Sequence, residues 1–172
     1  MEIFRLYILG NAGWLMVLPL ALNLFAEKLP AAYDPKRFDT GIPASVTLPE
    51  NLFRMIVCFS PFLMPLSISS PPQKAGLGIY IAGVILYYLG WGAEIFLPKS
   101  RWSTSWMGFL APAYTALFWL VGIGLICDRF FFASPYRSWM YLAAAVVFIG
   151  FHVTHTAMVF SREAHNNQIK SV

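Results

Sequence analysis

Five long stretches that carry almost no charge limit what this chain can fold into more than any other feature of its sequence. They cover about residues 3–25, 51–68, 77–97, 106–127 and 138–160. A helix of about 20 apolar residues is long enough to cross the hydrocarbon core of a bilayer. Only 12% of the 172 residues are charged, roughly half the share found in soluble domains. We therefore predict an all-α fold, a single-domain integral membrane bundle of about five transmembrane helices.

The connections between these segments are short, with one exception. Residues 26–50, AEKLPAAYDPKRFDTGIPASVTLPE, are rich in proline and charge and show no helical period. We interpret them as a long loop that acts either as a cover or as a tether. Inside the segments, prolines predict bends, because each one removes a backbone donor. These prolines are Pro19, Pro61, Pro65 and Pro112.

The distribution of positive charge predicts how the bundle is oriented. Five spans place the termini on opposite sides, so the long loop, the connection before residue 106 and the C-terminal tail share one face. That face has the larger number of Lys and Arg residues: Lys28, Lys36, Arg37, Lys99, Arg101, Arg162 and Lys170. The positive-inside rule therefore predicts a cytoplasmic C-terminus and an external N-terminus, and we expect the plasma membrane as the location.

Several functional classes are excluded by missing patterns. The net charge of +4 is spread thinly, without the dense basic run that nucleic-acid binding needs. Two cysteines cannot build a disulfide scaffold. The sequence contains no phosphate-binding loop, dinucleotide fingerprint or nucleophile motif, and we predict no cofactor. His152 and His155 lie one turn apart in HVTH and could share a metal with Glu94. The glutamate of the HExxH pattern is missing, however, and we predict no metal.

The third segment carries a stripe of small residues that predicts close helix packing. Gly76, Gly83 and Gly90 are spaced by seven and lie close to one helical face. Small residues let another helix approach, either within this chain or in a partner or second copy. Glu94 follows Gly90 by four residues, so we expect its side chain to point into the bundle and away from lipid.

Charge pairing offers a reason for a carboxylate at that depth. Arg54 lies about 6 Å inside the start of the second segment, and Glu94 lies about 6 Å inside the end of the third, on the same face. Charges within a membrane usually pair or line a watery cavity. We predict an Arg54–Glu94 pair, direct or through water. The alternative is that each side chain reaches the interface separately.

Other polar residues gather in the same half of the bundle, which predicts a polar half-pocket. The candidate ligand-binding residues are Arg54, Glu94, Trp91, Tyr88, Tyr114, His152, His155, Asn51 and Asn23. We expect a protein that binds or transports a small amphipathic molecule. One alternative is a membrane-embedded acid–base enzyme of isomerase or cyclase type, which acts on a lipid-like substrate through Glu94 or His155. Another is a structural subunit of a membrane complex. The sequence leaves open whether the protein is an enzyme.

Overall fold

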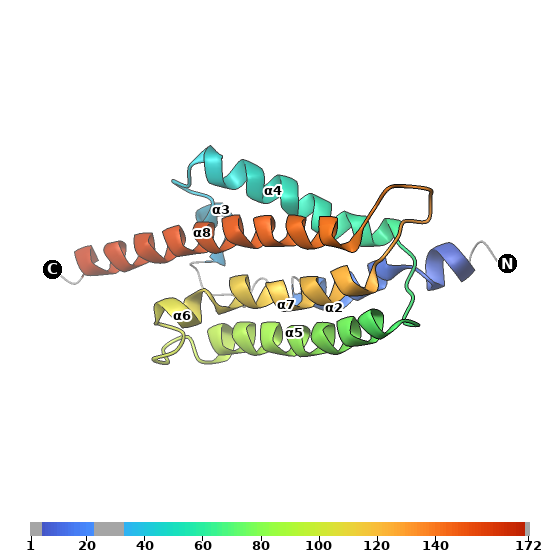
Figure 1. Ribbon diagram of the computed structural model, residues 1–172. Coiled ribbons are helices and arrows are strands. Elements are labelled where there is room, and N and C mark those ends of the chain that lie inside the picture. The colour runs from blue at the N-terminus through green and yellow to red at the C-terminus, as the bar shows by residue number, and fades with distance from the viewer. Residues whose placement is uncertain (1–4, 23–32, 171–172) are drawn as a thin grey trace.

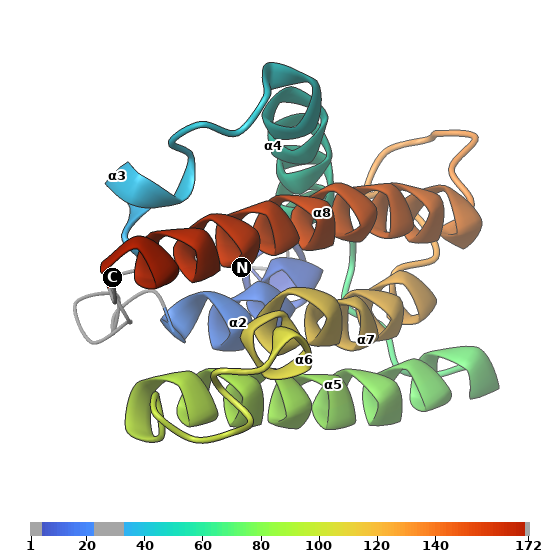
Figure 2. The ribbon, with the colours of Figure 1, turned by 90° about the vertical axis from the view of Figure 1, so that its left-hand side faces the viewer.

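The computed structural model describes residues 5–22 and 33–170, which fold into helices joined by short connections (Figure 1). The body consists of α4 (Ala44–Phe59), α5 (Pro71–Phe96), α7 (Ala111–Ile126) and α8 (Ser138–Lys170). Helix α8 packs against both α4 and α7, and α7 also packs against α5 (Figures 1 and 2). The described residues contain one isolated bridge and no strand. The all-α prediction is therefore confirmed.

Successive segments run in opposite directions along the bundle. As a result η1 (Arg5–Leu9) and the end of α8 lie at opposite ends of the molecule (Figure 1). Within the described residues, two helices are long and apolar enough to cross a membrane: α5 and residues Ser138–Asn166 of α8. The apolar stretches Ala12–Ala21 and Ala111–Ile126 are shorter. Two candidate spans agree with a helical membrane protein, and the predicted bundle of five spans remains a proposal.

The first apolar segment is a broken helix, which differs from the single span predicted over residues 3–25. After η1, which is a π-helix, the chain forms the 3₁₀ helix η2 (Ala12–Met16) and the short helix α2 (Val17–Ala21). The break lies at Asn11, whose side-chain oxygen accepts a hydrogen bond from the Gly13 amide at 2.7 Å. Its side-chain nitrogen donates to the Phe62 carbonyl at 2.7 Å. An asparagine that bonds the backbone in this way competes with the helix, which explains the interruption.

The backbone freed by this break pairs with a second irregular stretch. The Ala12 amide donates to the Met64 carbonyl at 2.9 Å, and the Leu66 amide donates to the Gly10 carbonyl at 2.7 Å. Unpaired backbone groups are costly away from water, so an interrupted helix needs such a partner. The two interruptions therefore satisfy one another.

The second predicted segment begins earlier and ends earlier than its sequence suggested. Helix α4 starts at Ala44, inside the predicted loop 26–50, and ends at Phe59. It continues as the 3₁₀ helix η5 (Ser60–Leu63). A shorter helix, α3 (Pro35–Phe38), also lies within that predicted loop.

Proline marks the ends of helices more than it bends them. Pro112 lies in the first turn of α7 and Pro61 in the first turn of η5. Pro65 lies in the non-helical link after η5, and Pro19 lies in the short helix α2. In a first turn, proline loses no hydrogen bond that the helix would have made. The predicted bends at Pro61, Pro65 and Pro112 are thus helix boundaries.

The small-residue stripe of α5 is covered by α7 of the same chain. A Cβ atom on Gly83 would meet the backbone of Trp119, and one on Gly76 would lie 2.8 Å from Leu125 Cβ. Gly90 is buried beside Ala111. The close helix packing predicted from Gly76, Gly83 and Gly90 is confirmed. We had also expected that this glycine face could bind a partner chain or a second copy. In the structure, α7 of the same chain covers it.

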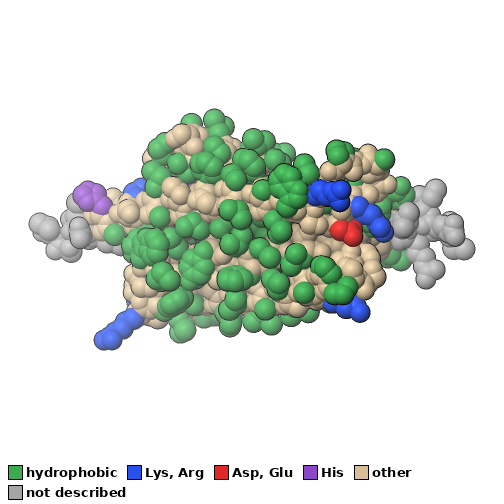
Figure 3. All heavy atoms as spheres, in the orientation of Figure 1, with side chains coloured by type: hydrophobic (Ala, Val, Ile, Leu, Met, Phe, Trp, Pro, Cys, Tyr) green, Lys and Arg blue, Asp and Glu red, His purple; other side chains and the backbone are tan. Residues whose placement is uncertain are grey.

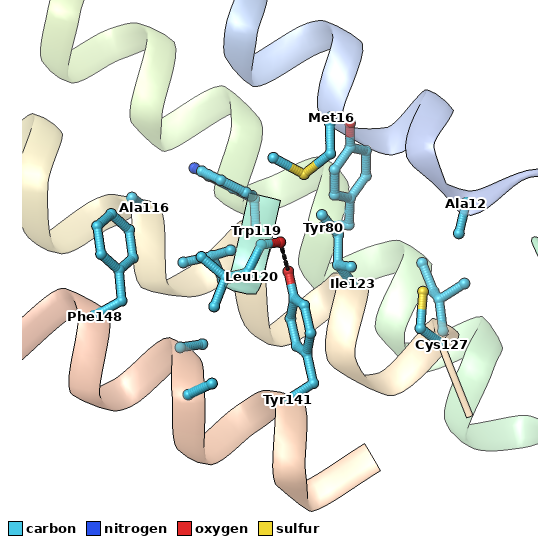
Figure 4. Close-up of a cluster of buried hydrophobic side chains, with 14 of the residues drawn as sticks. Ala12, Met16, Tyr80, Ala116, Trp119, Leu120, Ile123, Cys127, Tyr141 and Phe148 are labelled. Carbon is cyan, nitrogen blue, oxygen red and sulfur yellow. Dashed lines mark hydrogen bonds between the residues drawn. The ribbon is translucent and has the colours of Figure 1, made fainter. Parts of the chain in front are cut away.

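The core lies where α4, α5, α7, α8 and η2 meet (Figure 4). Its fully buried side chains include Met16, Leu120 and Ile123. The Tyr141 hydroxyl, also buried, donates to the Val57 carbonyl at 3.1 Å and joins α8 to α4. The polar atom of this tyrosine is therefore satisfied within an otherwise apolar core.

The surface between the two ends of the bundle is apolar. On the face shown in Figure 3, the basic, acidic and His side chains lie near the ends, and hydrophobic side chains cover most of the area between them. Exposed large side chains include Leu52 and Phe59 of α4, Leu89 of α5 and Val146 of α8, each more than half exposed. An apolar surface of this extent is typical of proteins whose solvent is lipid.

Candidate functional site

The polar residues singled out in the sequence belong to helix ends that meet at one end of the bundle. The start of α4, the end of α5, the start of α7 and the second half of α8 come together near α3 and α6 (Trp106–Phe109) (Figures 1 and 2). Asn23 lies outside the described residues. Most of the others belong to two separate groups, one around Glu50 and one around Glu94, and Tyr88 lies apart from both.

Glu50 is the centre of the first group and was not among the predicted site residues. Its side chain is 1% exposed and accepts from Arg54 of the same helix, one turn later. His152 Nδ1 lies 2.9 Å from Glu50 Oε1, and His155 Nδ1 lies 2.6 Å from Glu50 Oε2. An ionised carboxylate can only accept, so both imidazoles donate through Nδ1. Each oxygen of this buried carboxylate is therefore paired.

These contacts determine the charge state of Glu50. Burial alone would raise the pKa of this carboxyl group. The hydrogen bonds from His152 and His155, together with the charges of His152 and Arg54, outweigh burial and hold the pKa well below its ordinary value of 4.5. Glu50 is thus a carboxylate at neutral pH.

His155 connects this group to the segment around α3. Its Nε2 atom lies 3.3 Å from the Phe38 carbonyl and 3.5 Å from Asp39 Oδ1. The Phe38 ring also packs against the imidazole, with centroids 4.5 Å apart. Both ring nitrogens of His155 therefore face acceptors. A neutral imidazole has one N–H, so both contacts are satisfied together only in the imidazolium form.

Arg54 pairs with Glu50, and the predicted Arg54–Glu94 pair is wrong. The Arg54 guanidinium also donates to Asn51 at 3.2 Å and lies 5.8 Å from the Phe148 ring centroid on α8. The prediction failed because residue 50 was assigned to a loop, which removed a carboxylate at the i,i+4 position from consideration.

Glu94 forms the second group, on α5. It is 3% exposed, which confirms that it points into the bundle. The Ser103 hydroxyl lies near its carboxyl group and donates to the Ala93 carbonyl at 3.1 Å. Among the described residues, Glu94 Oε1 has no hydrogen-bond partner and no Lys, Arg or His lies within ion-pair distance of the carboxyl. Trp91 Nε1, one turn earlier on α5, is also buried without a partner there.

Aromatic side chains surround this second group. The Tyr33 ring packs edge-on against Trp91, with centroids 5.1 Å apart, and stacks on Phe109 at 4.7 Å. The Tyr33 hydroxyl donates to the Phe109 carbonyl at 2.7 Å. Burial, and then the nearby charge of Glu94, raises the pKa of the Tyr33 phenol well above its ordinary value, so the phenol is neutral. Tyr33, which lies just before α3, thus covers the Glu94 group with its ring.

The remaining predicted residues have separate places. The Tyr88 hydroxyl donates to the Leu18 carbonyl at 2.7 Å and holds the broken first segment against α5. Tyr114 is half-buried and packs against the aromatic cluster around Phe109. Asn51 is exposed, and its side-chain oxygen accepts a hydrogen bond from Arg54. Within the described part of the chain, no group of three or more His, Cys, Asp and Glu side chains is arranged to hold a metal ion.

A depression of about 220 Å³ lies at the other end of the bundle, beside the break in the first segment. It is lined by Tyr7, Ile8, Asn11, Gly13, Trp14, Val17 and Phe62. The Trp14 indole donates to the Ile8 carbonyl at 2.6 Å, and the side-chain amide of Asn11 bonds the backbone, so these polar groups are already satisfied. This depression offers mainly apolar surface to a ligand.

No family model, curated protein or solved structure matches this chain. Inference about function therefore rests on the two groups of side chains described above.

Proposed function

We propose that this protein is an integral membrane protein that binds or transports a small amphipathic molecule at the Glu94 group. One observation carries the proposal: Glu94 Oε1 and Trp91 Nε1 are buried one turn apart, and neither has a hydrogen-bond partner among the described residues. Buried polar atoms are nearly always paired, because each unpaired one costs about 1–3 kcal/mol. A ligand head group at this position would pair with Glu94 and lie against the Trp91 indole.

The surroundings favour an amphipathic ligand over a fully polar one. Tyr33, Phe109 and Leu110 are buried around the Glu94 group, and Tyr114 and Phe160 pack against them. These side chains would hold an apolar body while Glu94 and Trp91 hold the head group. The two long apolar helices, α5 and α8, support a membrane location. The five-span topology, the plasma membrane and a cytoplasmic C-terminus belong to this proposal.

Native mass spectrometry of protein purified in mild detergent tests the proposal. We expect a retained small molecule that is lost from the Trp91→Phe and Glu94→Gln variants, because the first removes the indole N–H and the second replaces the carboxyl group with a neutral amide. Trp106→Phe is the matched control, because the Trp106 side chain is 50% exposed and lies outside the group. A molecule retained equally by all variants, or by none including the wild type, would contradict the proposal.

A second candidate function is acid–base catalysis on a lipid-like substrate, and the contacts of His155 favour it. This imidazole lies between the buried carboxylate of Glu50 and the exposed carboxylate of Asp39, whose side chain is 71% exposed. A carboxylate that orients an imidazole is a common arrangement in acid–base catalysis, and the imidazolium form of His155 would act as the general acid. In an enzyme, His155→Gln would abolish turnover and leave binding at Glu94 intact. Loss of neither property, or of binding alone, would remove this candidate.

A further inference from the structure

We propose that the head group bound at Glu94 is cationic, an amine or quaternary ammonium that carries an apolar chain. This inference rests on the proposed function, because it names the chemical class of the ligand at the same site. It follows from the charge that the described residues leave uncompensated at Glu94, from the aromatic rings around it and from a contrast with Glu50.

The two buried glutamates differ in their cationic neighbours. Glu50 is surrounded by Arg54, His152 and His155, so its charge is fully compensated within the protein. Among the described residues, no cationic side chain lies within ion-pair distance of Glu94, which is buried to nearly the same extent. A buried carboxylate without a cation is costly and must be neutralised by a proton or by an external cation. A ligand cation would supply what the chain itself provides at Glu50.

The neighbouring rings fit a cation as well as an apolar body. Trp91 and Tyr33 lie beside Glu94, and Phe109 stacks on Tyr33. The faces of aromatic rings attract ammonium groups, and tryptophan does so most strongly. Quaternary ammonium ligands are commonly held by cages of such rings. An anionic head group would instead meet the carboxylate and a ring face, both of which repel it.

Binding of a cation would be linked to release of a proton. In the empty site, the Glu94 carboxyl can be neutralised by a proton. When the ammonium group binds, it pairs with the carboxylate, and the displaced proton passes to solvent. Cation affinity therefore rises with pH until the carboxyl is ionised in the free protein. A neutral ligand of the same shape would show no such dependence.

A series of probes with one chain and three head groups tests this inference. The probes are decyltrimethylammonium, decanol and decanoate, each below its micelle concentration, added to the full-length protein in non-ionic detergent. We expect the ammonium compound to bind about tenfold or more tightly than decanol, with proton release detectable in a weakly buffered sample. Glu94→Gln should remove the preference, whereas Glu163→Gln, a partly exposed glutamate on α8, should keep it.

The outcomes separate the class of ligand from the existence of the site. Equal binding of decanol and the ammonium compound, or tightest binding of decanoate, would overturn the cationic class and leave the proposed function standing. Binding of none of the probes by the wild-type protein would count against the proposed function as well. Proton release is measured on the wild-type protein, so the test holds even if Glu94→Gln fails to fold.

Discussion

At the scale of single residues, we expect the loss of the Glu50 carboxylate to reduce the stability of the protein the most. Glu50→Gln removes a buried carboxylate that compensates Arg54, His152 and His155. We expect the free energy of unfolding in detergent to fall by roughly 2–4 kcal/mol. The control Glu163→Gln breaks a 3.5 Å contact with Arg162 between partly exposed side chains and should cost less than about 1 kcal/mol. Similar losses in both variants would show that the cluster contributes little.

The pKa of Glu50 adds a pH dependence with a definite sign. Its pKa is lower in the folded protein than the ordinary value of 4.5 that applies when the chain unfolds. As pH falls below about 4.5, the unfolded chain binds a proton that the folded chain does not, and acid favours unfolding. The stability difference between wild type and Glu50→Gln should therefore be complete at neutral pH and shrink below that value. A difference that grew in acid would contradict this assignment of charge.

A double-mutant cycle tests which carboxylate forms the ion pair with Arg54. Because Arg54 contacts Glu50, the losses from Arg54→Met and Glu50→Gln should not add, with a coupling of about 0.5–3 kcal/mol. The losses from Arg54→Met and Glu94→Gln should add within about 0.5 kcal/mol. Strong coupling in the second cycle would restore the pairing that the sequence suggested. The melting of each variant in detergent supplies the data.

The sequence identified most members of the two groups but not how they combine. Glu50 and Arg54 have the i,i+4 spacing of a helical ion pair, a signal that was present in ENLFR. It was missed because Pro49 was taken as part of a loop, although α4 runs through it. The contacts of Glu50 with His152 and His155 join residues about a hundred positions apart, and no local pattern encodes them.

At the scale of helices, the contact between α5 and α7 depends on Gly83. Any side chain there would meet the backbone of Trp119 and Phe118, which cannot move without separating the helices. We expect Gly83→Ala to cost about 1–3 kcal/mol through overpacking. Gly78→Ala on the same helix has open space around its Cβ and should be neutral or slightly stabilising. Equal melting temperatures for the two variants would argue against close packing at Gly83.

The helices differ in how well their ends and interruptions can be predicted from the sequence. The apolar run of α5 and the packing of its glycines were predicted, because both are local properties, although the helix begins at Pro71 and not near residue 77. The interruption at Asn11 was not predicted, since it depends on Met64 and Leu66, which lie in another segment. Apolar composition alone cannot distinguish a continuous span from one interrupted by such pairing.

For the whole molecule, labelling of introduced cysteines tests the predicted topology. Ser45, Thr104 and Ala164 are exposed at the α3–α6 end, whereas Ser69 and Ser134 are exposed in the connections at the other end. In a background without Cys58 and Cys127, the first three positions should be labelled from the cytoplasm and the last two from outside. Labelling of all five from one side would reject a membrane-spanning bundle. A reversed pattern would keep the bundle and invert its orientation.

The interruption at Asn11 also has a consequence for how the chain is made. The freed backbone groups of the first segment find their partners at Met64 and Leu66, which leave the ribosome more than fifty residues later. In hydrocarbon, each unpaired group costs several kcal/mol. We therefore expect the first segment to wait at the insertion machinery or at the interface until residues 60–66 have been synthesised. Nascent chains arrested before that point should release their first segment into alkaline carbonate, and chains arrested beyond it should retain it in the membrane.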